Sequence, residues 1–151
     1  MPGPYLRLQH TYDEPLGHGW GIDLPGRPGP NLKFKSIQAH TLKTNEDDHS
    51  DMHVIFMKEK ILFLGAGAGR CLEARSVKPR SLLDAKRCRN SALQRWEVKA
   101  GELRLKDSRL CLTVGQQDTQ GRAGPTMFRR DLLLEKCQRN DAQIWCPVIY
   151  G

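Results

Sequence analysis

A pattern of cysteine, glutamine and tryptophan occurs twice in the second part of this 151-residue chain and limits its possible folds. The first copy comprises Cys71-Leu72, Cys88 and Gln94-x-Trp96, and the second comprises Cys111-Leu112, Cys137 and Gln143-x-Trp145. The second cysteine precedes the glutamine by six residues in both copies. A recurring unit of about 40 residues cannot bury its apolar face alone, so the copies are expected to pack against one another.

The two copies differ in length, which places an insertion in the second. The first cysteines are 40 residues apart and the tryptophans 49. The extra residues fall in the Gly/Gln-rich stretch "GQQDTQGRAGPT", residues 115–126. Loops absorb insertions at small entropic cost. The repeats are therefore assigned to 61–100 and 101–146.

Residues 54–151 have the pattern of an all-β domain. The stretch "MHVIFMKEKILFL" places two apolar runs around Lys58-Glu59-Lys60, which is typical of a hairpin. Short strand-like pieces follow, separated by turn residues, without a sustained 3.6-residue apolar period. Residues 1–53 are expected to be irregular and poorly ordered, since residues 24–33 contain five prolines and glycines and residues 43–51 form a polar, acidic loop.

The charge is concentrated in the second part of the chain. Residues 1–60 carry 7 Lys and Arg against 8 Asp and Glu, whereas residues 61–151 carry 17 against 9. A basic body attracts any polyanion by its long-range field, and it also serves solubility. One cluster of basic residues surrounds the first repeat and comprises Arg70, Arg75, Lys78, Arg80, Lys86, Arg87 and Arg89. It is interpreted either as a solvated face or as a site for sulfate or carboxylate groups of an anionic glycan.

The doubled motif resembles the QxW repeat of the ricin B-type lectin family, and "ILFLGAGAGRCLEA" (61–74) is similar to the first strands of the lectin domain in mannose-receptor-type proteins. Similar domains end the polypeptide GalNAc-transferases. The resemblance implies a β-trefoil of three repeats, with Trp96, Trp145 and Gln143 in the structural core. It also implies the disulfides Cys71–Cys88 and Cys111–Cys137, which leaves Cys146 without an assigned partner.

Only two of the three repeats are recognisable. Residues 1–60 contain neither cysteine nor Gln-x-Trp. Either a degenerate repeat lies in this region or the third repeat is lost, and the Pro/Gly density favours loss. We therefore expect an incomplete trefoil with open sheet edges, which a homo-oligomer would complete.

The sugar-binding residues of the family transfer poorly to these repeats. Members that bind sugar have Asp two residues after the first cysteine, an aromatic two before the second, and Asn before the QxW glutamine. The first repeat has Glu73, Lys86 and Leu93 there, with Asp84 nearby, and the second has Thr113, Glu135 and Ala142. The candidate carbohydrate-binding residues are therefore Glu73, Asp84, Lys86 and Gln94, and the second repeat is expected to be inactive.

Other kinds of site are weakly indicated. A dinucleotide fingerprint would need glycine at position 70, where Arg70 stands, and a long helix after it. His49 and His53 have helical metal-ligand spacing, but no helix or third ligand accompanies them, so an acidic surface loop is favoured. Without a nucleophile–base pair or phosphate loop, no catalytic residue and no cofactor are assigned.

The sequence therefore predicts a non-catalytic carbohydrate-binding module that recognises a glycan or glycosylated partner and not nucleic acid. The alternatives are the truncated lectin part of a GalNAc-transferase-like enzyme, or an interaction scaffold with inactive sugar sites. The cysteines indicate the secretory pathway, in the Golgi lumen or outside the cell, although no signal peptide or membrane span is visible.

Overall fold

The computed structural model describes residues 6–24, 36–42, 53–64, 69–120, 128–146 and 149–150. In these ranges the chain forms an eight-stranded sheet, ordered β12-β1-β2-β3-β11-β10-β9-β8, and a five-stranded sheet, ordered β13-β4-β5-β6-β7. The strands are β1 Arg7–Leu8, β2 Trp20–Asp23, β3 Gln38–Thr41, β4 Val54–Met57, β5 Lys60–Phe63, β6 Arg70–Ala74, β7 Leu83–Arg87, β8 Trp96–Lys99, β9 Glu102–Leu105, β10 Leu110–Gln120, β11 Phe128–Lys136, β12 Trp145–Cys146 and β13 Ile149–Tyr150. A 3₁₀ turn, η2, spans Ala92–Gln94. No helix among the described residues is long and apolar enough to cross a membrane.

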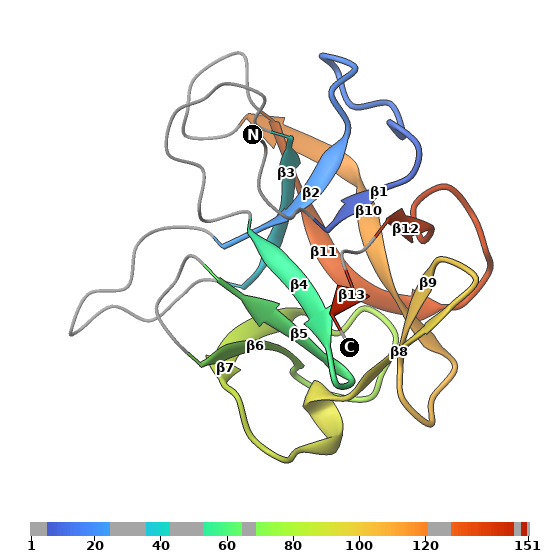
Figure 1. Cartoon of the computed structure of the whole chain (residues 1–151). Helices are drawn as coiled ribbons and strands as arrows, with labels where there is room; N and C mark the ends of the chain where they lie inside the picture. The colour runs from blue at the N-terminus through green and yellow to red at the C-terminus, as the bar shows by residue number, and fades with distance from the viewer. Residues whose placement is uncertain are drawn as a thin grey trace.

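The first twelve described strands form three units of four: unit 1 is β1–β4, unit 2 is β5–β8 and unit 3 is β9–β12. The middle strands of each unit pair as an antiparallel hairpin, β2–β3, β6–β7 and β10–β11. The last strand of each unit pairs with the first strand of the next, β4 with β5 and β8 with β9. The ring closes because β12 pairs with β1. This is the β-trefoil arrangement, and the expected all-β class is confirmed (Figure 1).

The N-terminal region differs from the sequence-based expectation. Within 1–53, which was expected to be irregular, β1, β2 and β3 are strands of the larger sheet, although residues 25–35 and 43–52 lie outside the described part. The third unit is therefore present within one chain, and the trefoil gives no reason for a second copy to complete it. In Figure 1, β1 to β3 (blue to cyan) lie beside β10 and β11 (orange).

Substitutions at the marker positions explain why unit 1 was not recognised. In units 2 and 3 the second cysteine donates a backbone hydrogen bond, from Cys88 N–H to the Gly69 carbonyl and from Cys137 N–H to the Arg109 carbonyl. The equivalent bond in unit 1 runs from Leu42 N–H to the Gly19 carbonyl. Leu42 therefore takes the place of the second cysteine, and Gly21 takes the place of the first. Val54 is opposite Phe63, as Trp96 is opposite Leu105 and Trp145 is opposite Leu8. A buried valine thus stands where the other units have tryptophan.

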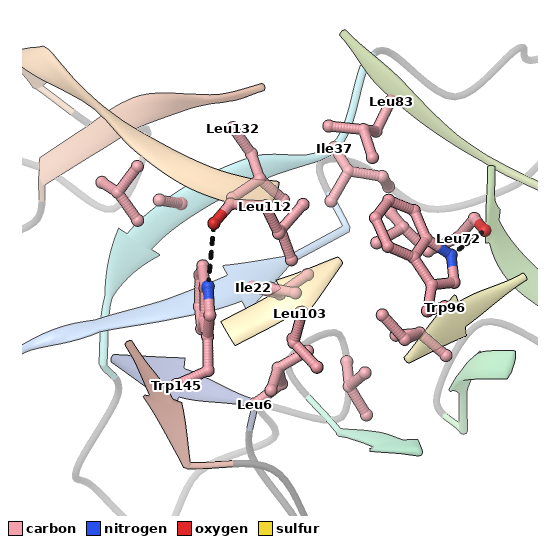
Figure 2. Close-up of a cluster of buried hydrophobic side chains, with 14 of the residues drawn as sticks. Leu6, Ile22, Ile37, Leu72, Leu83, Trp96, Leu103, Leu112, Leu132 and Trp145 are labelled. Atoms are coloured by element: carbon pink, nitrogen blue, oxygen red, sulfur yellow. Dashed lines mark hydrogen bonds between the residues drawn. The ribbon is translucent and has the colours of Figure 1, made fainter. Parts of the chain in front are cut away.

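The core joins residues from all three units. Trp96 and Trp145 are buried, and their indole N–H groups donate to equivalent carbonyls, those of Leu72 at 3.2 Å and Leu112 at 3.0 Å. Figure 2 shows the two indoles with Ile22 between them. Since an aromatic side chain buries 150–250 Å² or so, each indole is among the larger contributions to the core. The core therefore depends on N-terminal residues as well as on the two recognisable repeats.

Glutamines support the tryptophans in both recognisable repeats. The Gln94 amide accepts from Arg89 N–H at 2.9 Å and donates to the Arg87 carbonyl at 2.8 Å. Gln143 makes the equivalent bonds with Gln138 N–H at 2.7 Å and the Lys136 carbonyl at 2.9 Å. Both amides are buried, so each satisfies backbone groups that would otherwise lose their hydrogen bonds.

Two disulfides join the hairpin ends of units 2 and 3, as the family resemblance implied. They link Cys71 to Cys88 and Cys111 to Cys137, while Cys146 is exposed and free. Disulfides of this kind persist in oxidising environments, such as the secretory pathway or the cell exterior.

The insertion of unit 3 lengthens its hairpin rather than forming only a loop. The β10–β11 register shifts between Val114 and Asp118, where three residues of β10 face one residue of β11, and pairing then resumes from Asp118 to Gln120. Beyond this register shift, β11 also pairs with β3 of unit 1. The lengthened hairpin therefore joins unit 3 to the N-terminal unit. Residues 121–127 lie outside the described part.

Candidate functional site

The three middle hairpins have equivalent positions, one on the first strand and the residue directly opposite it on the second strand. In unit 2 Glu73 of β6 lies opposite Asp84 of β7. In unit 1 Asp23 lies opposite Gln38, and in unit 3 Thr113 lies opposite Leu133. The three hairpins are therefore three versions of one candidate site with different chemistry.

In unit 2, the carboxylate of Glu73 is occupied by intramolecular hydrogen bonds. Its Oε1 accepts from Arg89 Nε at 3.2 Å, from Arg89 Nη2 at 2.9 Å and from Gln94 Nε2 at 3.1 Å. The Glu73 side chain is buried, whereas that of Arg89 is exposed. This carboxylate thus anchors Arg89 and the QxW glutamine to the hairpin.

The other sequence-predicted residues of unit 2 are divided between an ion pair, solvent and the core. Asp84 accepts from Arg75 Nε and Nη2, both at 2.9 Å, and these hydrogen bonds raise the pKa of Arg75 above its ordinary value. Lys86 is exposed and Gln94 is buried. The structure brings Glu73 and Gln94 together and places Asp84 opposite Glu73, where its carboxylate is paired with Arg75.

Unit 1 carries a set of polar residues that sequence reasoning missed: Asp23, Gln38 and His40. Gln38 Nε2 donates to Asp23 Oδ2 at 2.8 Å, which fixes the orientation of the carboxylate. His40 has the hairpin position of Lys86 in unit 2, where the family resemblance places an aromatic. Its Nδ1 lies 2.7 Å from the carbonyl of Thr41, and its ring is buried.

The missed residues had a weak signal in the sequence. The family positions are counted from cysteines, and unit 1 has none, so Asp23 and His40 could not be located from the motif. A short alternation would have helped: Leu6-x-Leu8 matches Ile61-x-Phe63 and Leu103-x-Leu105 at the start of each unit. All six side chains are buried in the shared core.

Unit 3 combines its hairpin with a cavity of about 670 Å³. Thr113, Glu135 and Ala142 occupy the three positions that the family resemblance assigns to sugar binding, and all line this cavity. The Thr113 hydroxyl donates to the Cys111 carbonyl at 2.8 Å and accepts from Gln143 at 3.1 Å. The second recognisable repeat, which was expected to be inactive, therefore has an open cavity at these positions, and its polar groups differ from those that the family resemblance places there.

The basic cluster predicted around the first repeat is not a uniform surface. Arg75 and Arg89 are paired with Asp84 and Glu73. Arg70 lies directly opposite Arg87 on β6 and β7, an arrangement that disfavours the pairing by like-charge repulsion unless an anion or solvent screens it. Arg80 instead lines the unit 3 cavity.

One group of potential metal ligands occurs among the described residues, Glu102 with Cys111 and Cys137. The two sulfur atoms form a disulfide, so they are not thiolate ligands. Glu102 instead accepts a hydrogen bond from Arg139 N–H at 3.1 Å. Of the histidine pair considered from sequence, His49 lies outside the described residues.

Comparison with known proteins shows the fold. No family model matches the chain, and no curated protein matches it in sequence. Among solved structures, the β-trefoil lectin of the Vibrio vulnificus hemolysin/cytolysin, with N-acetyl-D-lactosamine bound, has a TM-score of 0.64 at 13% identity, covering 98% of this chain and 94% of that one. The earthworm lectin C-terminal domain, a mutant in complex with 6'-sialyllactose, has a TM-score of 0.61 at 11% identity, covering 95% and 96%. The designed three-fold symmetric protein ThreeFoil has a TM-score of 0.63 at 12% identity, covering 93% and 95%. The chain is thus a β-trefoil protein.

Proposed function

We propose that this chain is a non-catalytic carbohydrate-binding module that recognises a glycan or a glycosylated partner. The observation that carries the proposal is the Asp23–Gln38 pair of the unit 1 hairpin, in which the buried Asp23 carboxylate accepts from the Gln38 amide. A carboxylate accepts from several hydroxyl groups, and an amide both donates and accepts, which suits vicinal sugar hydroxyls. The likeness to lectins of known structure supports the proposal through the fold.

Unit 2 is the weaker candidate, because its two carboxylates are held by arginines. The Oε1 atom of Glu73 already accepts three hydrogen bonds, and both oxygens of Asp84 accept from Arg75. A sugar at unit 2 would have to replace these charge-assisted bonds, which are about twice as strong as neutral ones. The sequence-predicted unit 2 site, with Glu73 and Lys86 at its centre, is the second candidate.

A glycan array followed by calorimetric titration of the bound glycans tests the proposal. Asp23→Asn should weaken binding by about tenfold or more, because a hydrogen bond to a charged group contributes roughly 1.5–3 kcal/mol. Asp107→Asn is the matched control, since Asp107 is exposed in the β9–β10 turn with φ +61°, which asparagine also adopts. Circular dichroism checks that each variant is folded.

The outcomes separate the hypotheses. If Glu73→Ala abolishes binding while Asp23→Asn does not, unit 2 is the site. If the wild-type chain binds no glycan, the sugar proposal fails and an interaction scaffold with inactive sites remains. Binding restricted to sulfated or carboxylated glycans and lost at high salt would assign recognition to the basic cluster.

The cellular context is part of the same proposal. The two disulfides support folding in an oxidising compartment, in the Golgi lumen or outside the cell. The alternative, that the chain is the lectin part of a GalNAc-transferase-like enzyme, predicts that its longer form transfers sugar and that these residues alone do not.

A further inference from the structure

Three connections between strands meet at the β4–β5 turn. The Glu59 carbonyl of this turn accepts from Trp96 N–H at 2.7 Å, and the Arg95 carbonyl accepts from Lys106 N–H at 2.9 Å. These backbone bonds hold together the β4–β5 turn, the segment that enters β8 and the β9–β10 turn. In Figure 1 the β4–β5 turn (green) lies beside the segment that enters β8 (yellow). The side chains of the three connections are therefore gathered in one place.

Most of the charged side chains gathered there are basic. A hydrogen bond from Lys106 Nζ to Glu59 Oε1, at 2.8 Å, lowers the pKa of the Glu59 carboxyl, and the charges of Arg95 and Lys60 lower this pKa further. Three cations therefore lie close to one carboxylate. With one adjacent residue of each sign they form the turn cluster, which comprises Lys58, Glu59, Lys60, Arg95, Lys106 and Asp107.

The turn cluster has an excess of positive charge. Its four basic and two acidic residues give it a net charge of +2. Burial lowers the pKa of the Lys60 ammonium, and the charge of Arg95 lowers it further, although Glu59 acts in the opposite direction. The hydrogen bond to Glu59 raises the pKa of Lys106, and Arg95 again opposes this effect. Because like charges disfavour one another's ionised forms, an anion bound among these cations would be stabilised.

The three inner cations are held in place and retain donors for a ligand. Lys60 Nζ donates to the Arg89 carbonyl at 2.6 Å, and Arg95 Nη2 donates to Asn90 Oδ1. Lys106 donates to Glu59. A lysine has three N–H donors and an arginine five, so each bond leaves further N–H groups on its side chain. Side chains fixed before the ligand arrives lose less conformational entropy on binding.

The turn cluster is particular to one unit and is not a repeated feature of the trefoil. Glu102 precedes Leu103 as Lys60 precedes Ile61, so it has the position of Lys60 in unit 3. It accepts from Arg139 N–H at 3.1 Å, where Lys60 donates to a carbonyl. The equivalent position thus carries the opposite charge. The turn cluster contains no residue at the positions that the family resemblance assigns to sugar binding.

The charge of the turn cluster favours a doubly charged ligand. A phosphate monoester carries about −1.5 to −2 at pH 7 and has three acceptor oxygens, whereas a sulfate monoester of the same shape carries a single negative charge. Among the described residues, the large apolar side chains that are exposed lie outside the turn cluster: Leu16, Leu64 and Val77. Membrane-surface sites combine basic with apolar side chains, so a soluble partner is favoured.

We propose that the turn cluster binds a phosphate monoester group of a soluble partner. Lys60, Arg95 and Lys106 donate to the phosphate oxygens, and Glu59 limits the affinity by competing for Lys106. The turn cluster shares no residue with the Asp23–Gln38 pair and takes a ligand of different chemistry. This proposal and the glycan proposal can therefore fail separately.

NMR titration of the full chain with methyl phosphate and with methyl sulfate, at pH 8 and constant ionic strength, tests the proposal. The two esters have the same shape, but at this pH only methyl phosphate is a dianion. We expect methyl phosphate to bind about fivefold more tightly, the effect of one further charge at contact distance in water. Lys60→Gln and Arg95→Gln should each remove this preference. Lys78→Gln, at an exposed lysine outside the turn cluster, should retain it.

A further variant reverses the sign of the expected effect. Glu59→Gln removes the carboxylate that competes for Lys106, so methyl phosphate should bind this variant more tightly than the wild type. Loss of a purely structural contact would not tighten binding. Circular dichroism checks that each variant has the native fold.

Equal affinity for the two esters, or no binding of either, would overturn the proposal. The same holds if Lys78→Gln lowers the affinity as much as Arg95→Gln does, since binding would then reflect only the net charge of the chain. Weaker binding to folded Glu59→Gln would also contradict it. Sedimentation with phosphatidylcholine vesicles that contain phosphatidylinositol 4-phosphate tests the source of the group. Capture that Arg95→Gln abolishes would assign the phosphate to a lipid and overturn the soluble partner.

Discussion

At the scale of single residues, the two QxW tryptophans have the same surroundings in different units. Each indole N–H donates to the carbonyl of the residue after the first cysteine, and each is preceded by a buried glutamine. A tryptophan in this position both fills the core and satisfies a buried carbonyl. The equivalence explains why the tryptophan is the clearest marker of the repeat.

Replacing either tryptophan by phenylalanine should destabilise the fold by about 2–3 kcal/mol, since it leaves a small cavity and a buried carbonyl without a donor. Urea unfolding of Trp96→Phe and Trp145→Phe measures the cost, and the two values should agree within about 1 kcal/mol because the contacts match. Val77→Ala, at a side chain that is 56% exposed, should change little. A tryptophan variant as stable as the wild type would show that the paired contacts are unimportant.

At the scale of elements, the ring depends on tight turns between neighbouring units. The β4–β5 turn has Lys58 at φ +52° and Glu59 at φ +67°, and the β8–β9 turn has Ala100 at φ +50° and Gly101 at φ +87°. Paired positive φ values belong to the hairpin turns that match strand twist. The sequence predicted the first hairpin from its apolar runs.

Gly101 is needed for both its conformation and its lack of a side chain. An added Cβ would lie 2.9 Å from Ile144 Cγ2. Gly101→Ala should therefore cost the conformational penalty of roughly 1–2 kcal/mol and a further 1–3 kcal/mol from overpacking. Gly69→Ala is the matched control, because Gly69 has φ +84° with open space around it. Equal losses of unfolding free energy in the two variants would contradict the role of the Ile144 contact.

The elements that the sequence predicted are those marked by unusual side chains. Cysteine and tryptophan gave units 2 and 3, the two disulfides and the fold class. Unit 1 escaped because Gly21, Leu42 and Val54 replace the markers while preserving backbone pairing and burial. The Asp23 site escaped with it. The occupation of Glu73 by Arg89 could not be predicted, since it depends on a contact between residues 16 positions apart.

At the scale of the whole molecule, closure of the ring makes the N-terminal strands part of a single cooperative structure. β1 pairs with β12, and β3 pairs with β11. Removing β1–β3 would thus leave β12 without the strand it pairs with and β11 with β10 alone. The same strands, with the segments beside them, deliver side chains that are almost completely buried: Leu6, Leu8, Trp20, Ile22, Ile37 and Ala39.

A fragment of residues 54–151, which contains both recognisable repeats and both disulfides, should therefore fail to fold cooperatively. Five large apolar side chains at about 2 kcal/mol each contribute roughly 10 kcal/mol, comparable to the whole stability of a typical domain. Thermal unfolding by circular dichroism and the dispersion of amide proton signals compare the fragment with the full chain. The fragment should show a broad thermal transition and poorly dispersed amide proton signals. The full chain, which includes residues 1–53, should show a sharp transition and well-dispersed signals. A sharp transition and native dispersion in the fragment alone would establish 54–151 as an independent domain.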